Sequence, residues 1–168
     1  MALTKDCHTI QFGVPEVNNL VAYPVKAAAQ LYSGAVALLR AGYLINGASP
    51  LSTDLVVGII GDPAGGTAVQ TGAGILGGAT DGAVWVNVRT GSFLLQSGSG
   101  ADALVETGVG ATVYYHGENN SGPVIDATSG SSTRAPAGIL LPQDPGILGG
   151  VTPGSAYWPI KLNTVGGA

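Results

Sequence analysis

Charged side chains are scarce in this sequence. Of its 168 residues, only 10% are Asp, Glu, Lys or Arg, against about 25% in a typical soluble domain. A protein that stays in solution as a free monomer usually has a more charged surface. The scarcity therefore indicates a surface that partners cover, or one rich in Ser, Thr, Asn and Gly.

Basic residues form no cluster, and the net charge is −4. Nucleic-acid binding needs a basic patch that displaces the counterions of the phosphates, and a polybasic membrane contact needs one as well. We expect neither nucleic acid nor a membrane among the partners. The six basic residues are Lys5, Lys26, Arg40, Arg89, Arg134 and Lys161.

Cysteine and long apolar runs are also lacking. With Cys7 as the single cysteine, an intrachain disulfide cannot form, and a zinc site cannot be built from cysteine alone. The N-terminus has no apolar run of signal-peptide length. The apolar stretch 27–45 is interrupted by polar residues and glycines, whereas a membrane span needs about 20 apolar residues. We expect a soluble product that is not secreted.

Glycine and proline, in contrast, are abundant, with 28 and ten residues spread along the chain. They leave little room for ordinary helices, and the short apolar segments between them are rich in Val, Ile, Leu and Tyr. This pattern predicts an all-β fold, a small β-barrel or β-sandwich. The expected strands are 20–25, 35–39, 43–45, 54–60, 83–89, 92–96, 111–116, 123–127, 137–141 and 157–162.

The strand 83–89 has the clearest pattern, because Val84, Val86 and Val88 alternate with more polar residues. One alternative stays open at 26–40, where alanines and leucines would also suit a helix. Gly34 in its middle opposes a helix by about 1 kcal/mol. The segments 61–66 and 117–122 read as loops.

The ends differ from the middle in pattern. Residues 1–19 lack a clear period and are interpreted as an N-terminal arm, 20–141 as the β-rich domain, and 142–168 as a C-terminal loop with a final strand. Arms that leave a compact core can bind a partner.

Three motifs could carry chemistry. The glycines of the GxGxxG at 72–77 would suit a dinucleotide, but a glycine turn and a strand follow where a helix is needed. His116 and Glu118 form an HxE without the later cysteines of a zinc deaminase. Serines and aspartates are numerous, so a Ser-His-Asp triad with His116 as base stays open, although no GxSxG is present. We predict no catalytic residue, no metal and no cofactor.

Between residues 20 and 141 the chain resembles the small capsid decoration, or cement, proteins of tailed bacteriophages. The resemblance lies in an ordered series of glycine-punctuated strands: VVGIIGD, GAVWVNVRTGSFLL, VGATVYYHGENN and RAPAGILLP. It implies a non-enzymatic virion protein, with a β-tulip-like fold, made in the host cytoplasm. Such a protein binds the outer capsid surface and staples adjacent subunits against the pressure of packaged DNA.

The partners that the resemblance implies are the major capsid protein and further copies of the chain, in a homotrimer or a dimer. Capsid contact in this family is often made by an N-terminal arm, which would include Ile10, Phe12 and Val14. Tyr157 and Trp158 of the final strand are added as candidate partner-binding residues.

Two other hypotheses stay open. The aromatic residues could line the groove of a carbohydrate- or receptor-binding module from a phage tail or fibre, although packing in the core or at a subunit interface is the interpretation that we favour for most of them. A small hydrolase that depends on His116 is the third hypothesis. The aromatic residues concerned are Trp85, Phe93, Tyr114, Tyr115, Tyr157 and Trp158.

Overall fold

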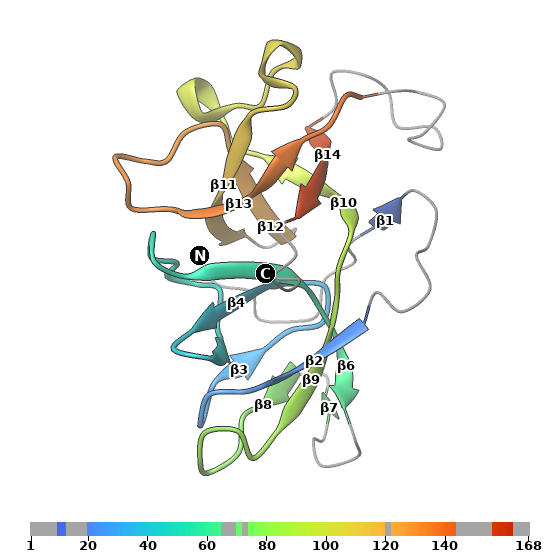
Figure 1. Ribbon diagram of the computed structural model, residues 1–168, viewed down its shortest axis with the longest axis vertical. Coiled ribbons are helices and arrows are strands. Elements are labelled where there is room, and N and C mark those ends of the chain that lie inside the picture. Colours follow the sequence, from blue (N-terminus) through green and yellow to red (C-terminus); the bar gives the residue numbers. More distant parts are fainter. Residues whose placement is uncertain are drawn as a thin grey trace.

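The computed structural model describes residues 10–12, 20–64, 70–71, 74–119, 122–143 and 156–162. These residues form an all-β fold, which confirms the expected class. The chain is arranged as a closed five-stranded barrel on top of a second, strongly curled sheet (Figure 1). In the described part of the chain, the only helices are two single 3-10 turns, η1 (Gly100–Asp102) and η2 (Glu106–Gly108).

The C-terminal half of the chain forms the barrel. Its strands follow the order β10-β12-β11-β13-β14, and β14 pairs back with β10 to close the ring. Closure removes the free edges that an open sheet would present. The strands are β10 (Ser92–Ser97), β11 (Thr112–Asn119), β12 (Gly122–Asp126), β13 (Ala135–Leu140) and β14 (Tyr157–Leu162).

The first half of the chain forms the second sheet, in the order β2-β9-β6-β4-β5. Its two outer strands meet at a single bridge between Val25 and Leu44, so the sheet curls back on itself. A small three-stranded sheet, β3-β8-β7, packs against it. The strands are β2 (Leu20–Pro24), β3 (Gln30–Leu31), β4 (Val36–Arg40), β5 (Tyr43–Ile45), β6 (Leu55–Ala64), β7 (Gln70–Thr71), β8 (Gly74–Leu76) and β9 (Trp85–Arg89).

Strands β4 and β6 are buried on both faces and join the two halves. Val36 and Leu38 belong to a core with the barrel, whereas Ala35 and Ala37 belong to the core of the curled sheet. In β6 a bulge opposite Ala37 adds one residue, which resets the alternation of the side chains. The two cores therefore share a wall, and neither half has a hydrophobic core independent of β4 and β6.

The helix considered for 26–40 does not form. This segment contains β3 and β4, separated by a turn at which Gly34 has a φ of 85°. A positive φ is easy for glycine and breaks a helix, so the backbone reverses there. No helix in the described residues is long and apolar enough to cross a membrane.

Most predicted strands are confirmed, but two predicted loops were wrong in part. Strand β6 continues to Ala64 because, beyond an irregularity, Pro63 and Ala64 pair again with β9. Strand β11 continues to Asn119, and β12 already begins at Gly122. Pairing across this hairpin extends both strands into the segment that the polar sequence had suggested to be a loop.

Candidate functional site

The structure brings the two chain segments named as partner-binding to opposite edges of one strand. Strand β1 (Ile10–Phe12) pairs with β10 on one side, and β14 pairs with β10 on the other. Within β14, Tyr157 is 42% exposed, whereas Trp158 is only 6% exposed and lies in the core. Of these two residues, Tyr157 is the one with surface to offer a partner. Val14 lies outside the described residues, as do the side chains of Ile10 and Phe12.

A second surface was not found from the sequence. On the outside of the curled sheet, cross-strand pairing places Pro24 beside Trp85 and Ala22 beside Asn87. Ala64 of β6 pairs with Trp85 from the other side, and directly paired residues share a face of the sheet. We call this the β2–β9 face; its apolar members are Leu20, Ala22, Pro24, Ala64 and Trp85.

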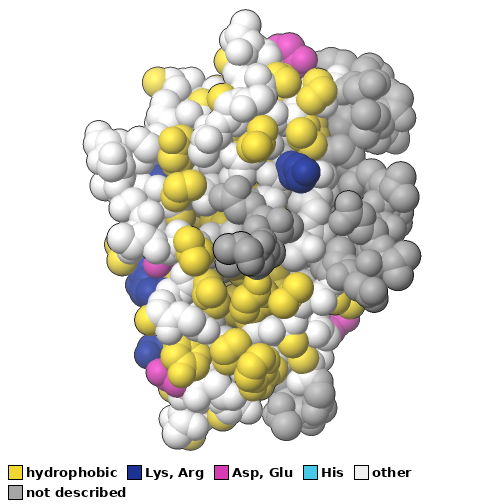
Figure 2. All heavy atoms as spheres, in the orientation of Figure 1, with side chains coloured by type: hydrophobic (Ala, Val, Ile, Leu, Met, Phe, Trp, Pro, Cys, Tyr) yellow, Lys and Arg dark blue, Asp and Glu magenta, His cyan; other side chains and the backbone are white. Residues whose placement is uncertain are grey.

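The β2–β9 face exposes large apolar side chains to solvent. Leu20 is 56% and Trp85 is 45% exposed. Figure 2 shows apolar side chains gathered in a broad band over the part of the molecule where Figure 1 draws β2 and β9. Among the described residues, β2 pairs along one edge with β9 and has no ladder along its other edge. Contiguous apolar surface beside an unpaired strand edge is typical of a protein-binding site.

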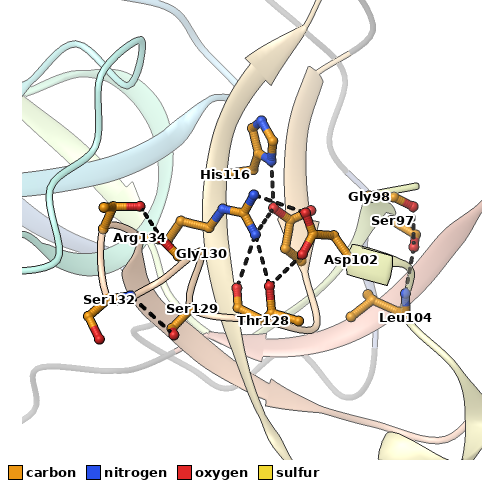
Figure 3. A network of polar contacts seen from close by, with 12 residues as sticks. Ser97, Gly98, Asp102, Leu104, His116, Thr128, Ser129, Gly130, Ser132 and Arg134 are labelled. Carbon is orange, nitrogen blue, oxygen red and sulfur yellow. Dashed lines mark hydrogen bonds and ion pairs between the residues drawn. The ribbon is translucent and has the colours of Figure 1, made fainter. Parts of the chain in front are cut away.

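A polar cluster at the barrel forms the other candidate site. Arg134, before β13, donates a hydrogen bond of 3.0 Å to Asp102 and forms an ion pair of 2.9 Å with Asp126 of β12. On the other side of Asp126, Nδ1 of His116 on β11 lies 2.5 Å from its Oδ2. Thr128 donates its hydroxyl to Asp102 and accepts from Arg134. Figure 3 shows these side chains converging from β11, from η1 and from the turn before β13.

The electrostatics of the two carboxyl groups differ. The hydrogen bond from Arg134, and after it the one from Thr128, lowers the pKa of Asp102 to about 2. Burial raises the pKa of Asp126, and the hydrogen bond from His116 opposes that shift. Asp126 has no exposed surface, while the His116 ring is half exposed. The cluster therefore holds one carboxylate near the surface and one buried.

The cluster borders a polar pocket of about 200 Å³. Its lining comes from β10, η1, β11 and β12, and consists of Gln96, Ser97, Gly98, Ser99, Asp102, His116, Asn119, Val124 and Asp126. Most of these side chains carry hydrogen-bonding groups, so the pocket is suited to a small polar ligand or an ion.

The structure does not assemble the other motifs into sites. His116 pairs with Asp126, but within the described residues no hydroxyl group forms a hydrogen bond with its second ring nitrogen. The aromatic residues are dispersed, because Phe93, Tyr115 and Trp158 lie in the core and Trp85 lies on the other half of the molecule. In the GxGxxG segment, Gly74 begins strand β8 and no helix follows.

The sequence analysis did not predict the pairing of His116 with Asp126. The signal that could have revealed it was that two predicted strands, 111–116 and 123–127, follow each other closely along the chain and could form a hairpin.

Compared with protein-family models, with curated proteins and with solved structures, the chain matches none of them.

Proposed function

We propose that this protein is a structural component of a bacteriophage virion that binds the outer surface of the capsid. In this proposal it binds the major capsid protein through the β2–β9 face and joins neighbouring capsid subunits. The bound form is a homo-oligomer, a trimer on the symmetry axes of the shell or else a dimer. The basis is the resemblance of residues 20–141 to capsid decoration proteins, together with the surface that the fold exposes.

The observation that carries the proposal is the exposed apolar β2–β9 face. Leu20 and Trp85 expose large apolar side chains. Burying their surface against a partner would contribute a favourable free energy of about 25 cal/mol per Å² of apolar surface. Scarce charge reduces the desolvation cost of covering such a surface. The capsid protein would have to cover it, because free exposure of this face favours aggregation.

Multiple copies on a symmetric shell make modest single contacts sufficient. If each copy in an oligomer contacts the shell, the second and third contacts form at high effective concentration, and avidity can exceed the single-site affinity by about 10²–10⁴. The closed barrel and the strands β4 and β6, which contribute to both hydrophobic cores, would make the protein rigid. Rigidity suits a protein that holds neighbouring capsid subunits together.

The first test is quantitative. Virus particles that encode this protein are purified by density, and the copy number of the chain is compared with that of the major capsid protein on a protein gel. A ratio near one to one, or a fixed simple fraction, supports the proposal. Absence from the particles, or only a few copies per particle, contradicts it.

The second test addresses the surface. Capsids that lack the protein are mixed with purified wild type, Trp85→Asp or Val105→Asp, and the bound fraction is measured by co-sedimentation. Trp85→Asp is expected to weaken binding by about tenfold or more, as loss of a central aromatic contact does. Val105 is just as exposed but lies beside η2, on the barrel, so Val105→Asp is the matched control. Equal binding of both variants would exclude the β2–β9 face.

A further inference from the structure

Three side chains of the polar cluster are arranged as ligands of a metal ion. Asp102, His116 and Asp126 each offer one ligand atom, and these atoms lie within 4.8 Å of one another. They come from separate elements, η1, β11 and β12, which the barrel holds together. A tetrahedral or octahedral ion accepts ligands of this type at about 2.0–2.2 Å from the metal, so small rotations of the side chains would bring them to one centre.

A second observation, independent of this spacing, points to a ligand. Asp126 has no solvent exposure, and its Oδ1 is buried without a hydrogen-bond partner. An unsatisfied buried carboxylate oxygen costs free energy, so native proteins usually satisfy it with a donor, water or a cation. Oδ1 lies beside Gly98, where a Cβ atom would clash with it. Only glycine at position 98 allows the carboxylate of Asp126 to lie there, beside the pocket that both residues line.

The donors around the cluster match the outer sphere of a metal site. Arg134 donates a hydrogen bond to Asp102 and forms an ion pair with Asp126, and Thr128 donates to Asp102. Such hydrogen bonds orient ligand carboxylates and fix their charge. The hydrogen bond with His116 and the ion pair with Arg134 both involve Oδ2 of Asp126, which leaves Oδ1 for the ion.

The charges of the cluster also favour a cation. Two carboxylates against the single positive charge of Arg134 leave one negative charge while His116 is neutral. One imidazole with two carboxylates suits zinc or a similar transition metal, whereas calcium and magnesium prefer oxygen ligands alone.

We propose that Asp102, His116 and Asp126 form a binding site for a divalent transition-metal ion, with zinc as the representative ion. The remaining coordination positions face the pocket and are open to water. Such an ion would cross-link η1, β11 and β12 and stabilise the barrel. The site goes beyond the proposed capsid function, and its test needs no capsid, so either proposal can fail without the other.

The test is a calorimetric titration of the metal-stripped full chain with zinc chloride at neutral pH, with melting curves in zinc and in chelator. The expected result is one zinc ion per chain and a higher melting temperature in zinc. His116→Ala, at a half-exposed position that tolerates truncation, is expected to weaken zinc binding by about tenfold or more. Asp102→Asn should do the same.

Asp81→Asn is the matched control, because Asp81 is also a carboxylate in an ion pair but lies on the other half of the molecule, with Lys26. It should bind zinc like the wild type. Because Cys7 and His8 could hold zinc themselves, the titrations are repeated in a Cys7→Ser, His8→Ala background. Absence of binding in that background, or equal binding by His116→Ala, would overturn the site.

Discussion

The guanidinium of Arg40 donates two hydrogen bonds, each 2.7 Å long, to the carboxylate of Asp54. The same carboxylate accepts the backbone N–H of Leu51, and Arg40 also donates to the carbonyl of Ser49. Asp54 is fully buried, although Arg40 reaches solvent. This pair fixes the connection between β5 and β6 to the end of β4.

Replacement of Arg40 by Ala is expected to destabilise the protein by about 1–3 kcal/mol, because it leaves the Asp54 carboxylate buried without its charged partner. Water that reaches the Arg40 side limits the loss. The measurement is chemical denaturation near neutral pH. Lys26→Ala, which breaks the exposed pair with Asp81, should change the midpoint far less. Equal shifts of the midpoint in the two variants would show that the pair of Arg40 with Asp54 stabilises the protein no more than the exposed pair of Lys26 with Asp81.

Gly58 is expected to tolerate no side chain. Its φ is 148°, and a Cβ atom there would overlap the carbonyl oxygen of Arg89 on β9. Gly58→Ala should therefore lower the free energy of unfolding by about 3 kcal/mol or more, because the backbone of β6 would have to move, and β6 contributes residues to both hydrophobic cores. Gly42→Ala is the control, because Gly42 also has a positive φ but nothing within 4 Å. It should cost about 1–2 kcal/mol, from backbone strain alone.

Tyr115 connects the barrel to the curled sheet. Its ring is fully buried, and its hydroxyl donates to the carbonyl of Gly47, 3.2 Å away. Tyr115→Phe should cost about 1 kcal/mol, the net value of such a bond. Tyr115→Ala should cost about 3–5 kcal/mol through the cavity that it leaves. A calorimetric scan checks both values. A Phe variant as damaged as the Ala variant would show that the hydroxyl, and not ring packing, dominates.

Acid stability should depend on Asp102. Its pKa in the folded protein is lowered to about 2, below the ordinary value near 3.9. A lowered pKa means that the folded state binds fewer protons than the unfolded state, so the stabilisation is complete above about pH 4 and is lost as the pH falls through about 2. Asp102→Asn should be less stable than the wild type at neutral pH, and this difference should shrink with acidification. Denaturation at a series of pH values measures it. A difference that is constant with pH would contradict the role of the Asp102 charge.

Most of the strands could be predicted from the sequence because they are short-range features. The alternation of Val84, Val86 and Val88 is enough to place β9, and Val86 and Val88 are indeed fully buried. Strand β1 was missed because three residues, Ile10–Phe12, give no periodicity, and their partners on β10 lie about half of the chain length away in the sequence.

The candidate sites depended on information that the sequence does not carry locally. Tyr114 pairs directly with Asp126, and His116 is the residue left unpaired by the bulge between Tyr115 and Gly117. The bulge, which no sequence pattern indicates, decides where the His116 side chain lies relative to Asp126. The β2–β9 face could not be predicted because its residues come from β2, β6 and β9, and the sequence does not show that these three strands pair side by side. The function and the partners stay predictions.

The barrel closes through its last strand, and this order matters while the protein is being made. On the ribosome, residues 20–89 emerge first and already include all five strands of the curled sheet. Strands β10 and β13, however, keep an unpaired edge until residues 157–162 leave the exit tunnel. Because synthesis proceeds at about 5–20 residues per second, each nascent chain passes through a period of seconds in which these edges can pair with another chain. Chains translated close together on one messenger are therefore the ones most exposed to mispairing.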